Sequence, residues 1–165
     1  MNGKAKLALA LTLLATSLGM SAASTQHSYE HTVCRAGTLH VLAKADKVIV
    51  MSVEHFGMVR SKMANDPLDG LTQHCVGVLA NVAGKASGNG WCKNVGPTPN
   101  DWFLLTWAVS ADKPGHGTFT YEYGAGKWKG ITGGGTFEPD GKTTPAQPGT
   151  YQNCVRARGT AQLPN

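Results

Sequence analysis

The segment Gly117–Tyr123 alternates strictly between two kinds of side chain, and this period of two limits the folds that the chain can adopt. Phe119, Tyr121 and Tyr123 fall on one side of an extended backbone, and Thr and Glu side chains fall on the other. Such a pattern is typical of a β-strand that is buried on one face. The chain contains 21 Gly and 8 Pro, and clusters of β-branched and aromatic residues recur at short intervals between these turn-forming residues. This distribution favours strands and turns over helices.

The other predicted strands are short and are separated by turn-forming residues. Asp101–Ser110 is the most hydrophobic of them, with Phe103 and Trp107 on the same face. Ala83–Asn100 has no apolar period and is rich in turn formers, so we predict a long connection there and a second loop over Pro139–Gly149. The remaining strands are expected in these segments: Thr38–Leu42, Lys47–Phe56, Thr72–Asn81, a segment after Gly133 that includes Thr136 and Phe137, and Tyr151–Arg158.

About seven or eight short strands indicate a mostly β protein. We expect a single antiparallel β-barrel of about eight strands, with a β-sandwich as the alternative. A barrel has a physical advantage, because closing the sheet leaves no strand edge unpaired.

The N-terminus has the three parts of a cleavable secretory signal, in the required order. Lys4 and Lys6 give a positive start, and Leu7–Leu18 is apolar but shorter than the about 20 residues that span a bilayer. Ala23 places a small side chain directly before the expected cut. We therefore predict that residues 1–23 are a signal peptide and that the protein is periplasmic or extracellular.

The expected mature chain, residues 24–165, is long enough for one hydrophobic core and too short for two ordinary domains. The full chain has a formal net charge of +5, and removal of the two signal lysines leaves about +3. These charges are scattered and form no dense basic stripe, which argues against a nucleic-acid partner. No later segment is apolar enough for a membrane span.

Four cysteines in an oxidising compartment are most simply explained by two disulfides, for which three pairings are possible. We favour Cys75 with Cys92, which flank a loop rich in Gly and Asn, and Cys34 with Cys154, near the two ends of the domain. The second bond would join the first strand to the last, which are neighbours in a closed barrel. No Cys-x-x-Cys spacing supports a zinc or redox site.

The strongest local signature is the glycine-rich run Gly117–Phe137, whose glycines surround Trp128 and Ile131. Glycines there free the backbone to adopt positive φ, and the two apolar side chains can anchor the turn. The run has neither the spacing of a phosphate-binding loop nor that of a dinucleotide fingerprint, so we predict no cofactor.

Part of this run resembles the allene oxide cyclase and dirigent protein superfamily, which carries a G-x-G-x-aromatic-x-G motif after a central strand. The matching residues are Gly124, Gly126, Trp128 and Gly130. The segments from Cys75 to Gly77 and from Gly88 to Cys92 are similar to small exported bacterial members, so the resemblance covers Cys75–Phe137. It implies a calycin-like eight-stranded barrel that can hold a small apolar ligand. No catalytic residue of the superfamily maps onto this chain by a motif, and none is carried over.

The aromatic side chains of the two clearest strands fit two uses: they can fill the core of a small barrel or form the wall of an apolar pocket. Core filling is the more common use. If a pocket exists, we expect Trp107, Tyr121 and Tyr123 to line it, because alternation places each with the inward apolar set of its strand.

Six histidines have no close metal-ligand spacing, so we predict no metal site. His27 and His31 are expected in a mobile start of the mature chain. Glu54 and His55 are adjacent on a strand, point to opposite faces and cannot act together as an acid and a base.

The leading functional hypothesis is a non-catalytic exported barrel that binds a small apolar molecule or an envelope partner. The alternative is an enzyme of cyclase or isomerase type, for which Glu54, Asp101 and Tyr121 are the candidate polar residues. A third hypothesis is an envelope interaction protein with a filled core and an active outer surface. A hollow interior would favour ligand binding, and a solid one would favour the third hypothesis.

Overall fold

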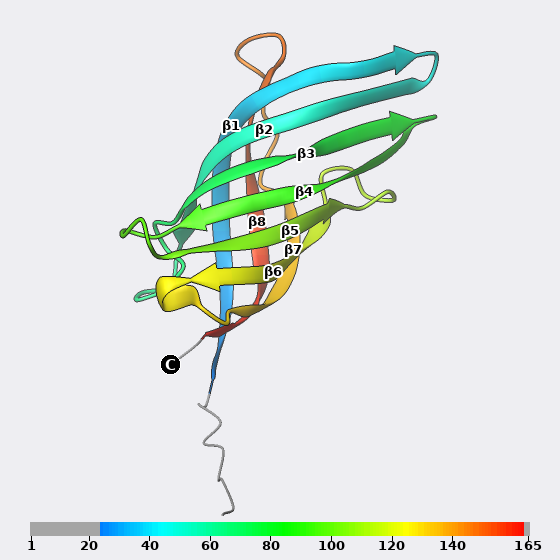
Figure 1. Ribbon diagram of the computed structural model, residues 1–165. Coiled ribbons are helices and arrows are strands. Elements are labelled where there is room, and N and C mark those ends of the chain that lie inside the picture. The colour runs from blue at the N-terminus through cyan, green and yellow to red at the C-terminus, as the bar shows by residue number, and fades with distance from the viewer. Residues whose placement is uncertain (1–23, 164–165) are drawn as a thin grey trace, which may run out of the picture.

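The computed structural model describes residues 24–163, and the predicted signal peptide lies outside them. Eight antiparallel strands form a closed barrel in which each strand pairs with the next and β8 pairs with β1 (Figure 1). The strands are β1 (Thr25–Ala45), β2 (Val48–Ser61), β3 (Thr72–Val82), β4 (Lys85–Val95), β5 (Trp102–Val109), β6 (Gly117–Ala125), β7 (Thr132–Pro139) and β8 (Thr150–Leu163), with a 3-10 turn, η1 (Gly126–Trp128), after β6. The predicted β-barrel is confirmed, and the sandwich alternative is excluded.

Two segments differ from the sequence prediction. Ala83–Asn100 was expected to be a long connection, but most of it is the strand β4. Its inward positions include Gly88 and Gly90, so the strand shows no apolar alternation in the sequence. Strand β1 also begins well before Thr38, at Thr25, and includes His27 and His31, which are therefore not in a mobile start.

Both favoured disulfides are present, and each joins directly opposite residues of neighbouring strands. Cys34–Cys154 links β1 to β8, the first strand to the last, and lies towards the outer face of the barrel. Cys75–Cys92 links β3 to β4 and is buried in the interior. One bond therefore fastens the seam at which the barrel closes, and the other belongs to the core.

One end of the barrel is closed by two connections. The loop of residues 62–71 between β2 and β3 brings Leu68 and Leu71 under the barrel, where both are fully buried. The glycine-rich turn between β6 and β7 brings in Trp128 and Ile131, and Trp128 packs edge-on against a core phenylalanine. We call this the closed end.

The motif glycines explain how the turn can cover the closed end. Gly126 and Gly130 have φ values of 60° and 90°, which favour glycine. A Cβ on Gly124 would lie 1.9 Å from the carbonyl oxygen of Trp128, so no larger residue fits at this position. The glycine-rich run is thus a structural device that folds the turn tightly onto the barrel.

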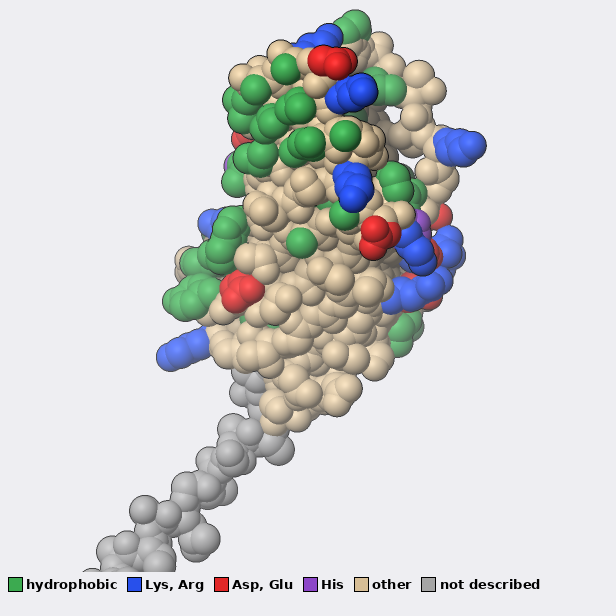
Figure 2. Space-filling view, turned by 90° about the vertical axis from the view of Figure 1, so that its right-hand side faces the viewer, with side chains coloured by type: hydrophobic (Ala, Val, Ile, Leu, Met, Phe, Trp, Pro, Cys, Tyr) green, Lys and Arg blue, Asp and Glu red, His purple; other side chains and the backbone are tan. Residues whose placement is uncertain are grey.

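The opposite end is formed by the β1–β2, β3–β4, β5–β6 and β7–β8 connections, and we call it the open end. Inward side chains here, such as Leu39, Met51 and Leu79, are half-buried, whereas inward side chains at the closed end are fully buried. Figure 2 views the side to which the β1–β2 and β3–β4 hairpins point and shows hydrophobic side chains gathered near its top. Solvent therefore reaches the interior from the open end.

Among residues 24–163, no helix is both long enough and apolar enough to cross a membrane.

Candidate functional site: a cavity at the open end

The interior of the barrel contains two adjoining cavities of different size. The inner cavity, towards the closed end, has a volume of about 60 Å³ and lies among buried residues that include Phe119 and Tyr121. It has room for a few water molecules. The outer cavity, towards the open end, has a volume of about 330 Å³ and is lined by apolar side chains such as Leu39, Met51 and Leu79. Small-molecule sites begin at about 300 Å³, so the barrel is filled at one end and hollow at the other.

Four side chains line both cavities and form the boundary between them: Arg35, Trp107, Phe137 and Val155. The indole ring of Trp107 lies close against the barrel wall, because Gly77 and Gly90 offer no side chain there. A Cβ on either glycine would lie within about 2.5 Å of the Trp107 ring. These two glycines let a large aromatic ring lie inside a small barrel without closing it.

Of the three side chains predicted to line a pocket, Trp107 and Tyr121 do so and Tyr123 does not. Trp107 borders both cavities, and Tyr121 is buried beside the inner one. Tyr123 is 57% exposed, on the outer face. Leu105 pairs with Tyr121 while Leu104 pairs with Tyr123, so β6 contains one extra residue at Glu122. This bulge reverses the alternation, which physically explains the difference from the prediction.

The outer cavity has a polar floor formed by three neighbouring strands, which we call the Arg35 cluster: Arg35 on β1, His55 on β2, and Tyr151 and Asn153 on β8. Arg35 and Asn153 are direct partners in the β1–β8 ladder, and Nε of Arg35 donates a 2.9 Å hydrogen bond to Oδ1 of Asn153. Nη1 of Arg35 lies 3.5 Å from Nε2 of His55, whose Nδ1 contacts the Tyr151 hydroxyl.

Gly37 makes the contact between His55 and Tyr151 possible. It is paired with His55 on one side and with Tyr151 on the other, so it separates the two residues along the sheet. A Cβ at Gly37 would lie 2.6 Å from Cβ of His55. Because glycine has no side chain, the imidazole and the phenol can meet above it.

The contacts of His55 define one arrangement of protons. Burial and the nearby charge of Arg35 lower the pKa of His55 from 6.5 to about 3, so the ring is neutral at neutral pH. A guanidinium can only donate, so Nε2 of His55 accepts from Arg35 and the ring proton is on Nδ1. Nδ1 then donates to the oxygen of Tyr151. The phenolic O–H of Tyr151 remains available as a donor, and burial raises the pKa of this residue to about 12.

The charge of Arg35 has no counter-ion inside the barrel. Neither cavity has an Asp or Glu among its lining residues, and within residues 24–163 no carboxylate forms an ion pair with Arg35. Burial lowers the pKa of the guanidinium, which still remains protonated at neutral pH. The outer cavity therefore combines apolar walls with an unpaired positive charge.

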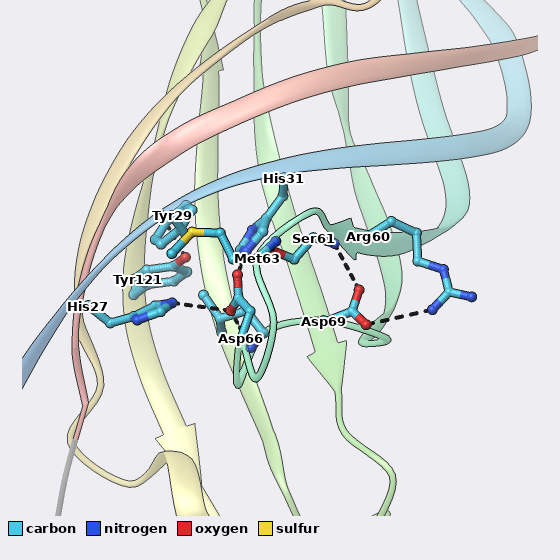
Figure 3. A network of polar contacts seen from close by, with 10 residues as sticks. His27, Tyr29, His31, Arg60, Ser61, Met63, Asp66, Asp69 and Tyr121 are labelled. Carbon is cyan, nitrogen blue, oxygen red and sulfur yellow. Dashed lines mark hydrogen bonds and ion pairs between the residues drawn. The ribbon is translucent and has the colours of Figure 1, made fainter.

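The closed end has a second polar network, centred on Asp66 in the β2–β3 loop (Figure 3). Oδ2 of Asp66 lies 2.7 Å from Nε2 of His31, and Oδ1 lies 3.2 Å from Nε2 of His27. The backbone N–H of Leu68 also donates to Asp66 at 2.9 Å. Burial raises the pKa of Asp66, but hydrogen bonds from Ser61, Leu68 and His31 together outweigh it and hold the pKa below its usual value. This Asp66 network ties the loop to β1 and keeps the closed end covered.

The carboxylates considered for catalysis lie away from both cavities. Glu54 is on the outer face of β2, where it contacts His74 at 2.8 Å, while its neighbour His55 points inward. Asp101 accepts hydrogen bonds from the hydroxyl of Thr98 and from the backbone of the β6–β7 turn. The structure therefore does not bring the three candidate catalytic residues together. Of Glu54, Asp101 and Tyr121, only Tyr121 borders a cavity.

His55, Cys75 and Cys92 place ligand-type atoms within 4.8 Å of one another in the core. Metal binding by cysteine requires a free thiolate. Both sulfurs are bonded to each other in this structure, so the group is explained by the disulfide packed beside a neutral histidine.

Sequence reasoning missed the Arg35 cluster, although one signal for it was present. If Cys34 pairs with Cys154, then Arg35 faces Asn153 one step along the same ladder, on the other face of the sheet. Because the cysteines lie towards the outside, their neighbours point inward. The predicted Cys34–Cys154 pairing therefore indicates two polar side chains, Arg35 and Asn153, at inward positions.

No protein-family model matches the sequence, and no curated protein matches it. Among solved structures, the fold is similar to that of a pterocarpan synthase dirigent protein, with a TM-score of 0.54 over 94% of this chain and 98% of that one. The two sequences are 8% identical, so the likeness concerns the fold alone. In fold, the chain is a dirigent-like β-barrel.

Proposed function

We propose that this chain is an exported, non-catalytic barrel protein that binds a small, largely apolar molecule in its outer cavity. The observation that carries the proposal is the cavity itself: about 330 Å³, lined mainly by aliphatic and aromatic side chains and reached from the open end. The filled interior at the closed end is compatible with ligand binding, because a small-molecule site needs only part of the interior of an eight-stranded barrel.

Export is the second part of the proposal. It is supported by the charged, apolar and small-residue zones of residues 1–23 and by the two disulfides of the barrel, which persist in oxidising compartments. A periplasmic or extracellular location agrees with the resemblance of the segments from Cys75 to Gly77 and from Gly88 to Cys92 to small exported bacterial members of the allene oxide cyclase and dirigent superfamily. The cyclase or isomerase alternative loses support, because Glu54 and Asp101 lie outside the cavities.

The ligand test uses N-phenyl-1-naphthylamine, a neutral apolar dye whose emission rises on leaving water. Titration into the purified protein should give saturable binding. Val109→Trp, which fills the outer cavity, should abolish the rise, whereas Ala108→Trp, on the outer face of the same strand, should leave it unchanged. Equal dye binding by both variants, with their folds intact by circular dichroism, would sink the proposal.

Binding of an envelope partner, the other form of the sequence-based hypothesis, has one supporting observation. Exposed apolar side chains occur on the outer faces of the adjacent strands β2, β3 and β4: Phe56, Met58, Val76, Val78 and Trp91. Val76→Lys would place a charge among them without altering the cavity. Unchanged dye binding by this variant would show that the two surfaces act independently.

A further inference from the structure

We infer that the ligand of the outer cavity carries a small anionic head group, of carboxylate type, which is bound by the guanidinium of Arg35 and the hydroxyl of Tyr151. The inference rests on the proposed function, which supplies the cavity and its apolar walls. It adds the chemical class of the ligand: an organic acid with a compact apolar body.

The first step concerns charge. A cation inside a barrel is costly unless it is paired, and buried arginines are normally accompanied by carboxylates. Arg35 has two neutral partners, Asn153 and His55, and the His55 contact is long at 3.5 Å. No carboxylate borders the cavities that it lines. An anionic group entering from the open end would supply the missing charge.

The second step concerns donors. The guanidinium has five N–H groups, of which the contacts described above use two, so a planar pair remains for a carboxylate. The proton arrangement of His55 leaves the Tyr151 O–H free as a donor on the same floor. The indole N–H of Trp107, at the boundary of the cavity, is buried and has no hydrogen-bond partner within residues 24–163. The cavity floor therefore presents donors and no anionic acceptor.

The third step concerns His55, which contacts both Arg35 and Tyr151. A second positive charge beside Arg35 would repel it, and burial together with Arg35 holds His55 neutral. The ring therefore acts as a spacer that orients both Arg35 and Tyr151. With apolar side chains above it, the head group would lie in a poorly solvated region, where charge-assisted hydrogen bonds are strong.

The test compares two dyes that differ by one anionic group. 8-Anilino-1-naphthalenesulfonate is the sulfonated counterpart of N-phenyl-1-naphthylamine, so the pair isolates the charge. We expect Arg35→Met to weaken binding of the anionic dye roughly tenfold to a hundredfold, and to change binding of the neutral dye less than about threefold. Arg60→Met removes one exposed positive charge on β2 outside the cavity and should change neither.

Competition then identifies the head group. 2-Naphthoate should displace the anionic dye from the wild-type protein, and uncharged 2-naphthamide of the same shape should not. Octanoate tests whether an aliphatic body is accepted as well as an aromatic one. Tyr151→Phe should weaken binding of naphthoate more than it weakens binding of the neutral dye.

The outcomes separate the two claims. If the neutral dye binds in the cavity but Arg35→Met leaves the affinity for naphthoate unchanged, the anionic head group is wrong and the proposed ligand-binding function stands. If neither dye responds to Val109→Trp, the proposed function itself fails. Arg35→Gln, which keeps a hydrogen-bond donor without the charge, replaces Arg35→Met if that variant does not fold, and the same loss of anion preference is expected.

Discussion

Tyr121 donates a hydrogen bond to Tyr29 across the interior of the barrel, with 2.7 Å between the two hydroxyl oxygens. The residues come from β6 and β1, and a Cβ on Gly159 would lie 2.8 Å from the Tyr29 oxygen, so the glycine leaves space for this hydroxyl. Tyr29 also stacks on His31, with 4.5 Å between ring centroids, and His31 contacts Asp66. The aromatic filling of the closed end is thus continuous with the network that holds its loop.

Loss of the tyrosine pair should lower the stability of the closed end. Tyr121→Phe keeps the ring but leaves the buried hydroxyl of Tyr29 without this donor, so we expect the free energy of unfolding to fall by about 1 to 2 kcal/mol. Urea unfolding followed by circular dichroism measures it. Tyr123→Phe is the matched control, since Tyr123 is on the outer face. Equal effects of the two substitutions would contradict the structure.

Asp66→Asn should loosen the loop of residues 62–71. The substitution removes the charge that accepts from both histidines and from the Leu68 backbone, and we expect a loss of about 2 to 3 kcal/mol. Lys62 at the start of this loop should then be cleaved faster by trypsin. Asp69→Asn alters the more exposed carboxylate of the same loop and should have the smaller effect. Indistinguishable cleavage rates would argue against the network.

The protein should lose stability in acid because of His55. Its pKa is about 3 in the folded state and 6.5 when unperturbed, so the unfolded chain takes up the proton first as the pH falls. The contribution of neutral His55 to the free energy of unfolding is fully present above pH 6.5. It decreases as the pH falls towards 3, by at most about 1.4 kcal/mol per pH unit. The lowered pKa values of His31 and Asp66 act in the same direction.

Urea unfolding at several pH values between 7 and 4 tests this expectation. His55→Gln should flatten the dependence of stability on pH, and His74→Gln, an exposed histidine on the neighbouring strand, should retain it. A wild-type slope in His55→Gln would show that other groups cause the acid sensitivity.

The two disulfides should differ in their contribution to stability. In the chain-entropy model, the bond that spans 120 residues stabilises by about 5 kcal/mol, and the bond that spans 17 residues by about 3 kcal/mol. Replacing Cys34 and Cys154 together by alanine should therefore lower the unfolding free energy more than replacing the pair Cys75 and Cys92. Removal of the buried pair Cys75 and Cys92 also leaves a cavity in the core, which adds to its loss of stability. The difference in unfolding free energy between the two double variants is therefore smaller than chain entropy alone predicts. A clearly larger loss for the buried pair would mean that core packing outweighs chain entropy here.

The sequence predicted the barrel where side chains follow the pleat. Phe119, Tyr121 and Trp107 point inward as expected. The disulfide between Cys34 and Cys154 was favoured because the two cysteines lie near the ends of the domain, and it agrees with a closed barrel. These features depend on local alternation and on cysteine chemistry, both of which can be seen without a structure.

The missed features depend on contacts between strands. Strand β4 has glycine at inward positions because Trp107 of β5 occupies the space in front of Gly90. Tyr123 points outward because β6 has a bulge at Glu122, which is seen only in the pairing of β6 with β5. Arg35 has an inward position that an apolar pattern does not reveal. In each case a neighbouring strand determines what the local residues alone cannot.

The bond between Cys34 and Cys154 also has a consequence for how a molecule enters. Because it fastens the β1–β8 seam covalently, the mouth of the barrel cannot widen by parting the first strand from the last. The shortest ladder lies elsewhere: β6 and β7 are paired at only four positions, between Gly117–Thr120 and Gly134–Phe137. Phe137 belongs both to this ladder and to the boundary of the outer cavity. Transient opening of the barrel is therefore directed to the β6–β7 ladder, two ladders away from the disulfide-linked one, where the fewest residue pairs hold the wall of the cavity.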